Sequence, residues 1–268
     1  MTLKNAEKIL SDAGIEEARH EARIIFATVG GEPVYKLLSP SYSSESPEVE
    51  SAVYRRAKRE PLAYIVGFVD FYNERYKVTP DCLIPRPDTE VLVDFAVANI
   101  PEGESFIDLC TGSGCVAIST LANTNGTRAI AADISEAALS VAEENAGFME
   151  VLDRIDFVCA DVTKKPLTDK VFAVLSNPPY VSESAYRTLE PEIFCEPEIA
   201  FLGGEDGGDF YRILTPMYRD IIADNGFIAY EIGYDQAELL AKIAAENSMR
   251  CSILRDLSGN TRVAVLRK

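Results

Sequence analysis

Apolar residues recur at three- and four-residue spacing along the first part of the chain, a pattern typical of amphipathic helices. Three such stretches occur. The first ends before Gly14, a residue suited to a left-handed helix C-terminus, and the second covers residues 18–25. The third begins at Ser46-Pro47, where serine can cap the helix and proline fits its first turn. The pattern therefore predicts a small helical domain over residues 1–75.

The pattern changes at residues 62–79, which are rich in aromatic and β-branched side chains. This composition predicts a β-hairpin with its turn at Asn73-Glu74. The hairpin would link the helical domain to a second domain over residues 76–268.

From residue 104 onward, short apolar runs alternate with helical stretches. This alternation predicts a parallel sheet with helices on both faces, the doubly wound or Rossmann-like α/β arrangement. Near the C-terminus, two strand-like segments joined by Ser258-Gly259-Asn260 predict a closing antiparallel hairpin. The expected strands of the alternating part are residues 105–110, 128–133, 155–160, 171–176 and 226–232, and the expected helices are residues 115–122, 135–147, 209–223 and 235–247.

Composition and charge narrow the class of protein. No apolar run approaches the ~18 to 20 residues needed to cross a bilayer, and the first ten residues contain Lys4, Glu7 and Lys8 where a signal peptide would be apolar. We therefore expect a cytoplasmic protein with no membrane partner, and a monomer. The formal net charge is −17, of which residues 76–268 carry −15. Because nucleic-acid binding normally needs a basic surface, we expect no direct nucleic-acid binding.

Metal binding is not expected either. The six cysteines form no C-x-x-C pair, and His20, the only histidine, lies in a polar stretch with helical character. This set lacks the ligands of a zinc site. Most of the thiols are predicted to be small buried hydrophobes in a reducing compartment.

The first candidate site is the segment 108–114, Asp-Leu-Cys-Thr-Gly-Ser-Gly, between an expected strand and an expected helix. Its glycines allow backbone N–H groups to approach a ligand at a helix N-terminus. With Ala117 the segment satisfies the pattern G-x-G-x-x-A, and Asp133 follows Gly112 by 21 positions. An acid at that distance can accept hydrogen bonds from ribose hydroxyls. The pattern predicts an adenosine-type cofactor and leaves NAD and S-adenosylmethionine open.

The second candidate site is Asn177-Pro178-Pro179-Tyr180, directly after the fourth expected strand. Strand C-termini line the ligand crevice of a doubly wound sheet. Two successive prolines fix the backbone and remove two donors, which leaves the Asn177 side-chain oxygen and the Pro178 carbonyl as acceptors. Acceptors without donors suit an NH2 group and would aim its nitrogen at an electrophile. A sulfonium methyl is such an electrophile and a nicotinamide is not, so this site favours S-adenosylmethionine.

The chain resembles the HemK/PrmC family, the peptide chain release factor glutamine-N5 methyltransferases, along nearly its whole length. The Asn-Pro-Pro-Tyr element is shared with amine methyltransferases of DNA and RNA, whereas Ile-Pro-Arg-Pro-Asp-Thr-Glu at residues 84–90 is more discriminating. Other matching segments are Pro61-Leu62-Ala63-Tyr64-Ile65, Glu196-Pro197, Gly203-Gly204, Glu231-Ile232-Gly233 and Asp256-Leu257-Ser258-Gly259.

The resemblance implies a seven-stranded class I methyltransferase domain behind a helical substrate-docking domain. It implies methyl transfer from S-adenosyl-L-methionine to the side-chain amide nitrogen (N5) of the glutamine in the Gly-Gly-Gln motif of release factors, with S-adenosyl-L-homocysteine as product. By resemblance, Asn177, Pro178 and Tyr180 are catalytic and, together with Pro179, bind the glutamine amide. Cofactor contacts are implied for Cys110, Thr111, Gly112, Ser113, Gly114, Asp133, Asp161, Val162, Asn177, Arg86 and Glu90.

Two departures from the family pattern and one long connection yield further expectations. Cys110 stands where the family usually has glycine, and a cysteine fits there if its φ is negative. Asn73 replaces a common hairpin glycine, a tolerable change because asparagine also adopts positive φ. Residues 181–208 show no clear periodicity, and long connections of this kind are often functional. We expect this one to cover the active site and to become ordered on substrate binding.

Four other functions fit parts of the pattern. Methylation of a glutamine in a ribosomal protein is chemically identical, and only the docking surface would differ. Methylation of an exocyclic amine in nucleic acid should add a basic face. A non-catalytic cofactor-binding module would leave the acceptor cluster, Asn177-Pro178-Pro179-Tyr180, unused. A dehydrogenase is disfavoured because nothing resembles a hydride-transfer site.

Overall fold

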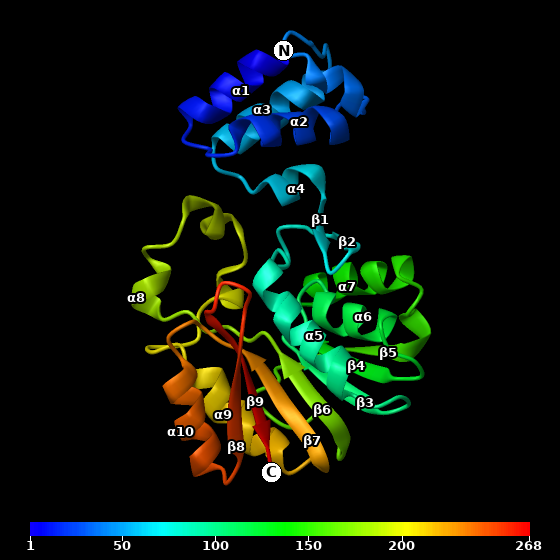
Figure 1. Ribbon diagram of the computed structural model, residues 1–268, viewed down its shortest axis with the longest axis vertical. Helices are drawn as coiled ribbons and strands as arrows, with labels where there is room; N and C mark the ends of the chain where they lie inside the picture. Colours follow the sequence, from blue (N-terminus) through cyan, green and yellow to red (C-terminus); the bar gives the residue numbers. More distant parts are fainter. The chain divides into compact units, whose positions relative to one another are not determined.

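The computed structural model describes residues 1–268, which divide into two compact units (Figure 1). The first unit comprises Met1–Phe68 together with Glu190–Cys195, and the second comprises Val69–Leu189 and Glu196–Lys268. The sequence predicts a boundary after residue 75, later than the one in the structure. None of the helices is both long and apolar enough to cross a membrane.

The first unit is helical. Two helix ends lie at the predicted capping residues. Gly14, just after α1, has φ +76°, and at the start of α3 the Ser46 hydroxyl accepts a hydrogen bond from the Val49 N–H at 3.3 Å. Apolar faces of the helices meet in one core that includes Leu10, Phe26 and Val53. The elements are α1 (Leu3–Asp12), α2 (Ala18–Thr28), η1 (Val34–Leu38), α3 (Pro47–Ala57), α4 (Leu62–Val66) and η4 (Pro191–Cys195).

The segment predicted as a hairpin over residues 62–79 begins as a helix instead. Helix α4 buries Ile65 in the core of the first unit and ends at Gly67, which has φ +86°. Burial of the apolar side chains therefore outweighs their β-propensity. The hairpin itself is shorter, with strands β1 (Phe68–Phe71) and β2 (Glu74–Lys77).

The turn of this hairpin lies one residue earlier than predicted. Its central residues are Tyr72 and Asn73, with φ of +52° and +64°. Positive φ at both positions is the signature of a type I′ turn, whose twist matches that of the flanking strands. Asn73 occupies the second position, where asparagine is favoured, so its predicted tolerance of positive φ is correct.

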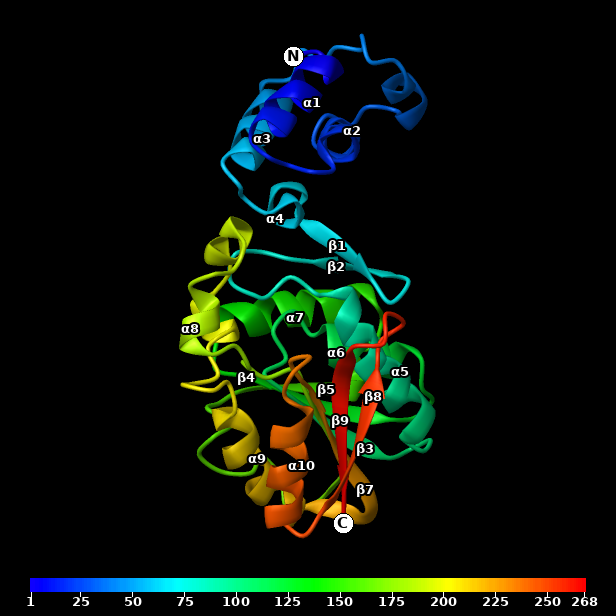
Figure 2. The same cartoon turned by 60° about the vertical axis from the view of Figure 1, so that its left-hand side comes forward.

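The second unit contains a seven-stranded sheet of order β5-β4-β3-β6-β7-β9-β8 (Figures 1 and 2). The first five of these strands are mutually parallel, and β9 runs antiparallel to both β7 and β8. The predicted parallel sheet and closing hairpin are confirmed. The strands are β3 (Ser105–Leu109), β4 (Arg128–Asp133), β5 (Ile155–Cys159), β6 (Val171–Ser176), β7 (Ile222–Glu231), β8 (Arg250–Arg255) and β9 (Thr261–Arg267).

Helices cover both faces of this sheet, as the alternation predicted. One face packs against α5, α6 and α7, and the other packs against α9 and α10. Helix α9 ends at Arg219, earlier than predicted, because Ile222 already pairs with Val171 as the first residue of β7. The remaining elements are η2 (Pro87–Thr89), α5 (Glu90–Asn99), α6 (Cys115–Ala122), α7 (Glu136–Phe148), η3 (Leu152–Arg154), α8 (Glu183–Tyr186), η5 (Glu198–Ala200), α9 (Asp209–Arg219) and α10 (Ala237–Glu246).

A buried asparagine on α7 connects this layer to strand β2 and to the loop after β3. The Asn145 side chain accepts from the Lys77 N–H at 2.8 Å and donates to the carbonyls of Lys77 and Ser113 at 3.0 and 2.9 Å. We expect Asn145→Ala to lower the free energy of unfolding by about 3 kcal/mol, because it leaves these buried backbone groups unpaired. Urea denaturation measures the loss. Asn247→Ala is the control, since the Asn247 amide donates only to Ile243 one turn back, and equal losses would contradict the prediction.

Candidate active site

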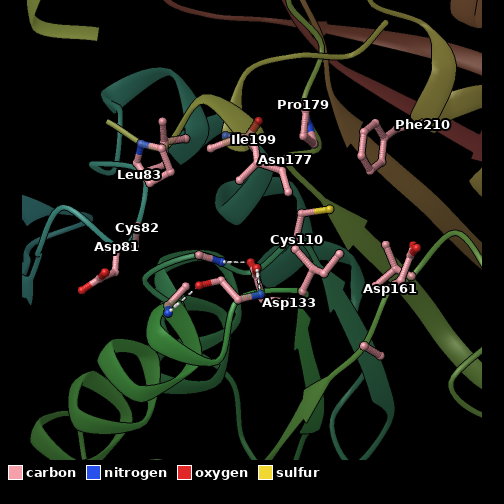
Figure 3. A pocket seen from close by; sticks show the side chains of 18 residues that line it. Asp81, Cys82, Leu83, Cys110, Asp133, Asp161, Asn177, Pro179, Ile199 and Phe210 are labelled. Carbon is pink, nitrogen blue, oxygen red and sulfur yellow. Dashed lines mark hydrogen bonds between the residues drawn. The ribbon is translucent and has the colours of Figure 1, made fainter. Parts of the chain in front are cut away.

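The carboxyl ends of β3, β4, β5 and β6 open into one cavity of the second unit, with an empty volume of about 740 Å³ that is partly open to solvent (Figure 3). Three carboxylates, those of Asp81, Asp133 and Asp161, line the cavity, and no lysine or arginine does. The charge of the lining therefore favours a cationic ligand. Its apolar members include Leu83, Ile134, Ile199 and Phe210.

The loop after β3 turns tightly into α6, and hydrogen bonds to a buried carboxylate stabilise this turn. Asp108 accepts hydrogen bonds from the Thr111 hydroxyl at 2.6 Å and from the Ala117 N–H at 3.2 Å. Burial raises the pKa of Asp108 to about 7. Gly112, in the glycine loop of residues 110–114, has φ +55° and lines the cavity.

Cys110 corrects one expectation. Its φ is +60°, not negative, so the position requires the left-handed conformation that glycine adopts without strain. The cysteine therefore stores backbone strain beside the cavity that it lines. The sequence identifies the unusual residue and the condition for an unstrained cysteine, a negative φ, and the structure does not meet that condition.

We expect Cys110→Gly to raise the free energy of unfolding by about 1 kcal/mol, since left-handed φ costs an L-residue about 1–2 kcal/mol and glycine returns part of this in chain entropy. Thermal unfolding of the purified variant measures the gain. Cys110→Ala is the matched control, because it removes the thiol and keeps the strain. A gain of the same size in Cys110→Ala would assign the effect to the thiol.

Asp133 ends β4 and is fixed by two backbone donors. Its Oδ2 accepts from the Gly112 N–H at 2.9 Å and its Oδ1 accepts from the Ser135 N–H at 3.0 Å. Each carboxylate oxygen retains a further lone pair for a ligand. Asp133 thus connects the glycine loop to the cavity, and Figure 3 shows it across the cavity from Asn177.

Asp161 and Val162 follow β5 and also line the cavity, beside Ala160. The Asp161 Oδ1 accepts from the Thr163 N–H at 3.0 Å. Hydrogen bonds from Thr163 keep the pKa of Asp161 below its usual value. The carboxylate is therefore ionised and turned partly into its own loop.

The acceptor cluster follows β6 at the same edge of the sheet. Asn177 and Pro179 line the large cavity, and Asn177 also lines a smaller neighbouring cavity with Thr111 and Ser113. The Asn177 Nδ2 donates to the Thr89 hydroxyl at 3.3 Å, which leaves its Oδ1 available to a ligand. The structure therefore brings the two predicted sites together.

Tyr180 is held by its hydroxyl. It donates to Oε1 of Glu231, the last residue of β7, at 3.1 Å. Burial raises the pKa of Tyr180, so the phenol remains protonated. Neither Pro178 nor Tyr180 lines the large or the smaller cavity.

Three further predicted residues have defined places. Arg86 lines the smaller cavity and bonds the buried carboxylate of Glu196, which also accepts from the Ile84 N–H at 2.9 Å. Gly114 lines neither cavity: it is the N-cap of α6 at φ +82°, where a Cβ would lie 2.6 Å from an Ile118 methyl. Glu90 also lines neither cavity and accepts from the Tyr72 N–H at 2.9 Å.

Sequence reasoning assigned no role to several residues that the structure places at the site. Thr89 and Glu231 contact the acceptor cluster, and Ile134, Ile199 and Phe210 supply apolar lining. Ile134 is 53% exposed and directly follows Asp133, so an apolar residue after the acidic strand end was an available signal. The apolar lining suits a flat heterocycle beside the carboxylates.

The strand order is that of the class I methyltransferase fold, which this chain shares with the ribosomal protein L11 methylase from Lactobacillus delbrueckii subsp. bulgaricus (TM-score 0.52, 19% identity, covering 71% of this chain and 83% of that one). Family models describe residues 2–67 as the PrmC N-terminal domain and residues 87–202 as the methyltransferase small domain. Release factor glutamine methyltransferases from Caulobacter vibrioides and Cereibacter sphaeroides are 34% and 35% identical, over 97% and 99% of this chain and 93% and 96% of theirs. The chain belongs to this family, which confirms the resemblance seen in its sequence.

Proposed function

We propose that this chain transfers a methyl group from S-adenosylmethionine to the side-chain amide nitrogen of the glutamine in the Gly-Gly-Gln motif of release factors. One observation carries the proposal: Asn177 and Pro179 of the acceptor cluster share a cavity with Gly112 and Asp133 of the predicted cofactor site. The names of the relatives, at 34% and 35% identity over nearly the full chain, support the same reaction.

The lining residues fit S-adenosylmethionine. Three carboxylates and no basic side chain suit a cationic ligand, and the Asp133 carboxylate suits a ribose diol. The apolar residues Ile134 and Leu83 suit the adenine ring, with Asp161 and Val162 at its edge. Gly112 and its neighbours Cys110, Thr111 and Ser113 would hold the methionine part, since all four line one or both cavities.

The acceptor cluster performs the positioning in this mechanism. When bound, S-adenosylmethionine supplies an electrophilic methyl group on its sulfonium. The Asn177 Oδ1 and the Pro178 carbonyl would accept both N–H bonds of the glutamine amide, with Tyr180 packing against it. Holding both bonds weakens delocalisation of the nitrogen lone pair and fixes its direction of attack. The amide proton can leave to solvent after transfer, so no strong base is needed.

The segment 181–208 would cover this site and become ordered when the protein substrate binds. It is not devoid of structure, since it contains α8, η4 and η5, and Pro197, Ile199 and Ala200 line the cavity. Limited proteolysis tests the idea: protection of this segment should require both ligands. Unchanged cleavage with both ligands bound would refute a covering role.

The partners and setting proposed for the chain follow from the same reaction. We propose that the helical domain docks the release factor, and that the enzyme acts in the cytoplasm as a monomer. The charge of −15 over residues 76–268 argues against a polyanionic substrate. Methylation of a ribosomal-protein glutamine or of an exocyclic amine in nucleic acid is the alternative.

Mass spectrometry of purified release factor, after incubation with this protein and S-adenosylmethionine, tests the proposal. Tandem fragmentation should locate one added methyl group on the Gly-Gly-Gln glutamine. A preparation that binds S-adenosylmethionine and adds no methyl to release factor would refute the substrate and leave the fold and cofactor standing. Ribosomal proteins and RNA would then be tested in the same way.

A further inference from the structure

Thr89 lies between the acceptor cluster and a buried carboxylate. It is the N-cap residue of α5, yet its side chain makes no capping hydrogen bond. The hydroxyl instead accepts from the Asn177 Nδ2 at 3.3 Å. Thr89 is 2% exposed and Glu231 is 1% exposed, so water does not compete for these contacts. The usual structural role of threonine at a helix start does not explain this side chain.

The two carboxylate oxygens of Glu231 differ in their hydrogen bonding. Its Oε1 accepts from the Tyr180 hydroxyl at 3.1 Å, whereas its buried Oε2 has no hydrogen-bond partner. Burial raises the pKa of this carboxyl to about 7, and the nearby Thr89 hydroxyl acts in the opposite direction. Buried acceptors without donors are costly, so the Thr89 proton is drawn toward Glu231.

We propose that Thr89 and Glu231 are positioning residues that fix which way the Asn177 amide faces. A threonine hydroxyl has one proton to donate. If it donates that proton in a hydrogen bond to the Glu231 carboxylate, Thr89 can only accept a hydrogen bond from Asn177. The Nδ2 of Asn177 must then face Thr89, and its Oδ1 must face the cavity. This inference rests on the proposed function, because it explains how the site presents an acceptor to an NH2 substrate.

The orientation decides what the site can bind. An inverted Asn177 amide would present N–H bonds to the substrate nitrogen, which also carries N–H bonds, and the two would repel. A site built from acceptors discriminates against groups that cannot donate, because its own polar atoms would be left unpaired. The pair Thr89–Glu231 thus contributes specificity for an amide without touching the substrate.

The charge state of Glu231 provides a readout. The Tyr180 hydroxyl donates to it, the Thr89 hydroxyl lies beside it, and the charges of Arg262 and Asp88 act on its pKa in opposite directions. A protonated Glu231 can donate a hydrogen bond to the Thr89 hydroxyl. The Thr89 hydroxyl would then be free to donate to the Asn177 Oδ1, and the Asn177 amide would face the opposite way. We therefore expect kcat to fall as the pH drops below about 7, and this limb of the profile to disappear in Thr89→Val.

Steady-state kinetics of release factor methylation form the first test. Thr89→Val should lower kcat by about 10- to 100-fold, as expected for a misoriented catalytic group, with the dissociation constant of S-adenosylmethionine within about threefold of the unmodified protein. Thr89→Ser should restore most of the loss because it keeps the hydroxyl. Glu231→Gln should resemble Thr89→Val, since a glutamine amide can donate to Thr89.

Thr120→Val is the matched control, because Thr120 is equally buried and its hydroxyl bonds only the Val116 carbonyl of its own helix. It should leave turnover unchanged. Turnover of Thr89→Val within about twofold of the unmodified protein would overturn the inference, as would an equal loss in Thr89→Ser.

Nuclear magnetic resonance of the Asn177 side-chain NH2 separates this inference from the proposed function. The signal is assigned by its absence in Asn177→Ala. Thr89→Val should shift it and speed its hydrogen exchange, and Thr89→Ser should not. If the unmodified protein adds no methyl to release factor, the proposed function fails, while the resonance still decides whether Thr89 orients Asn177. An unchanged resonance in Thr89→Val refutes the inference whatever the substrate.

Discussion

Replacing Asn177 with alanine should abolish turnover and leave cofactor binding nearly intact. The Asn177 Oδ1 faces the cavity because its Nδ2 is engaged by Thr89 at 3.3 Å. Alanine removes the one side-chain acceptor of the cluster and leaves the Pro178 carbonyl, which cannot hold both N–H bonds. Loss of a single preorganised polar contact of this kind costs about 100- to 1000-fold in kcat. The amide nitrogen would then retain its delocalised, unreactive lone pair.

Single-turnover methylation of release factor and isothermal titration with S-adenosylmethionine measure the two properties separately. Asn123→Ala is the matched control, because its amide donates only to the Ser119 carbonyl one turn back on α6. It should retain both properties. A loss of cofactor affinity in Asn177→Ala as large as the loss of turnover would show that Asn177 mainly holds the cofactor.

Local periodicity accounts for the parts of the fold that the sequence predicted well. Helix α6 occupies residues 115–122 as predicted, and strands β4 and β6 match their predicted bounds. The adjacency of the glycine loop and Asn177 was also predictable, because parallel strands β3 and β6 place their carboxyl ends at one edge of the sheet. These predictions need only the apolar pattern and the rule for doubly wound sheets.

Backbone conformation at single residues was not predictable from the same pattern. Tyr72 and Cys110 both have positive φ, a backbone conformation that is uncommon for residues other than glycine. In each case the surrounding structure imposes the conformation: the twist of a two-residue hairpin at Tyr72, and the tight turn into α6 at Cys110. Residue type alone would have assigned both to extended backbone.

Contacts between distant residues were likewise hidden. In the first unit, the nearly buried guanidinium of Arg56 donates to Glu192 at 2.9 Å, although 136 positions separate them. This ion pair ties Glu190–Cys195 to the helical unit, whereas the sequence assigned the whole of residues 181–208 to one connection. The contact between Asn177 and Thr89 spans 88 positions. Neither has a local sequence signature, since each depends on how the elements pack.

Replacing Asp133 with alanine should weaken cofactor binding more than turnover, the opposite of the effect expected for Asn177→Ala. We expect the dissociation constant of S-adenosylmethionine to rise by about 100-fold or more, since two hydrogen bonds to a charged acceptor are worth about 1.5–3 kcal/mol each. The Gly112 N–H would also lose its acceptor at 2.9 Å, so the glycine loop would lose one of its fixed points. Turnover should recover partly at saturating cofactor, because the acceptor cluster is untouched.

Ser135→Ala distinguishes ligand binding from simple loss of structure. Asp133 accepts from the Ser135 N–H, and the Ser135 hydroxyl in turn caps α7 by accepting from the Ala138 N–H at 3.1 Å. Removing the cap should cost about 1 kcal/mol of stability and leave the Asp133 carboxylate in place, so cofactor affinity should change little. Ser135 also lines the cavity, so if Ser135→Ala weakens cofactor binding as much as Asp133→Ala, the effect of Asp133→Ala is not specific to its carboxylate. Only a loss confined to Asp133→Ala supports direct contact between this carboxylate and the cofactor.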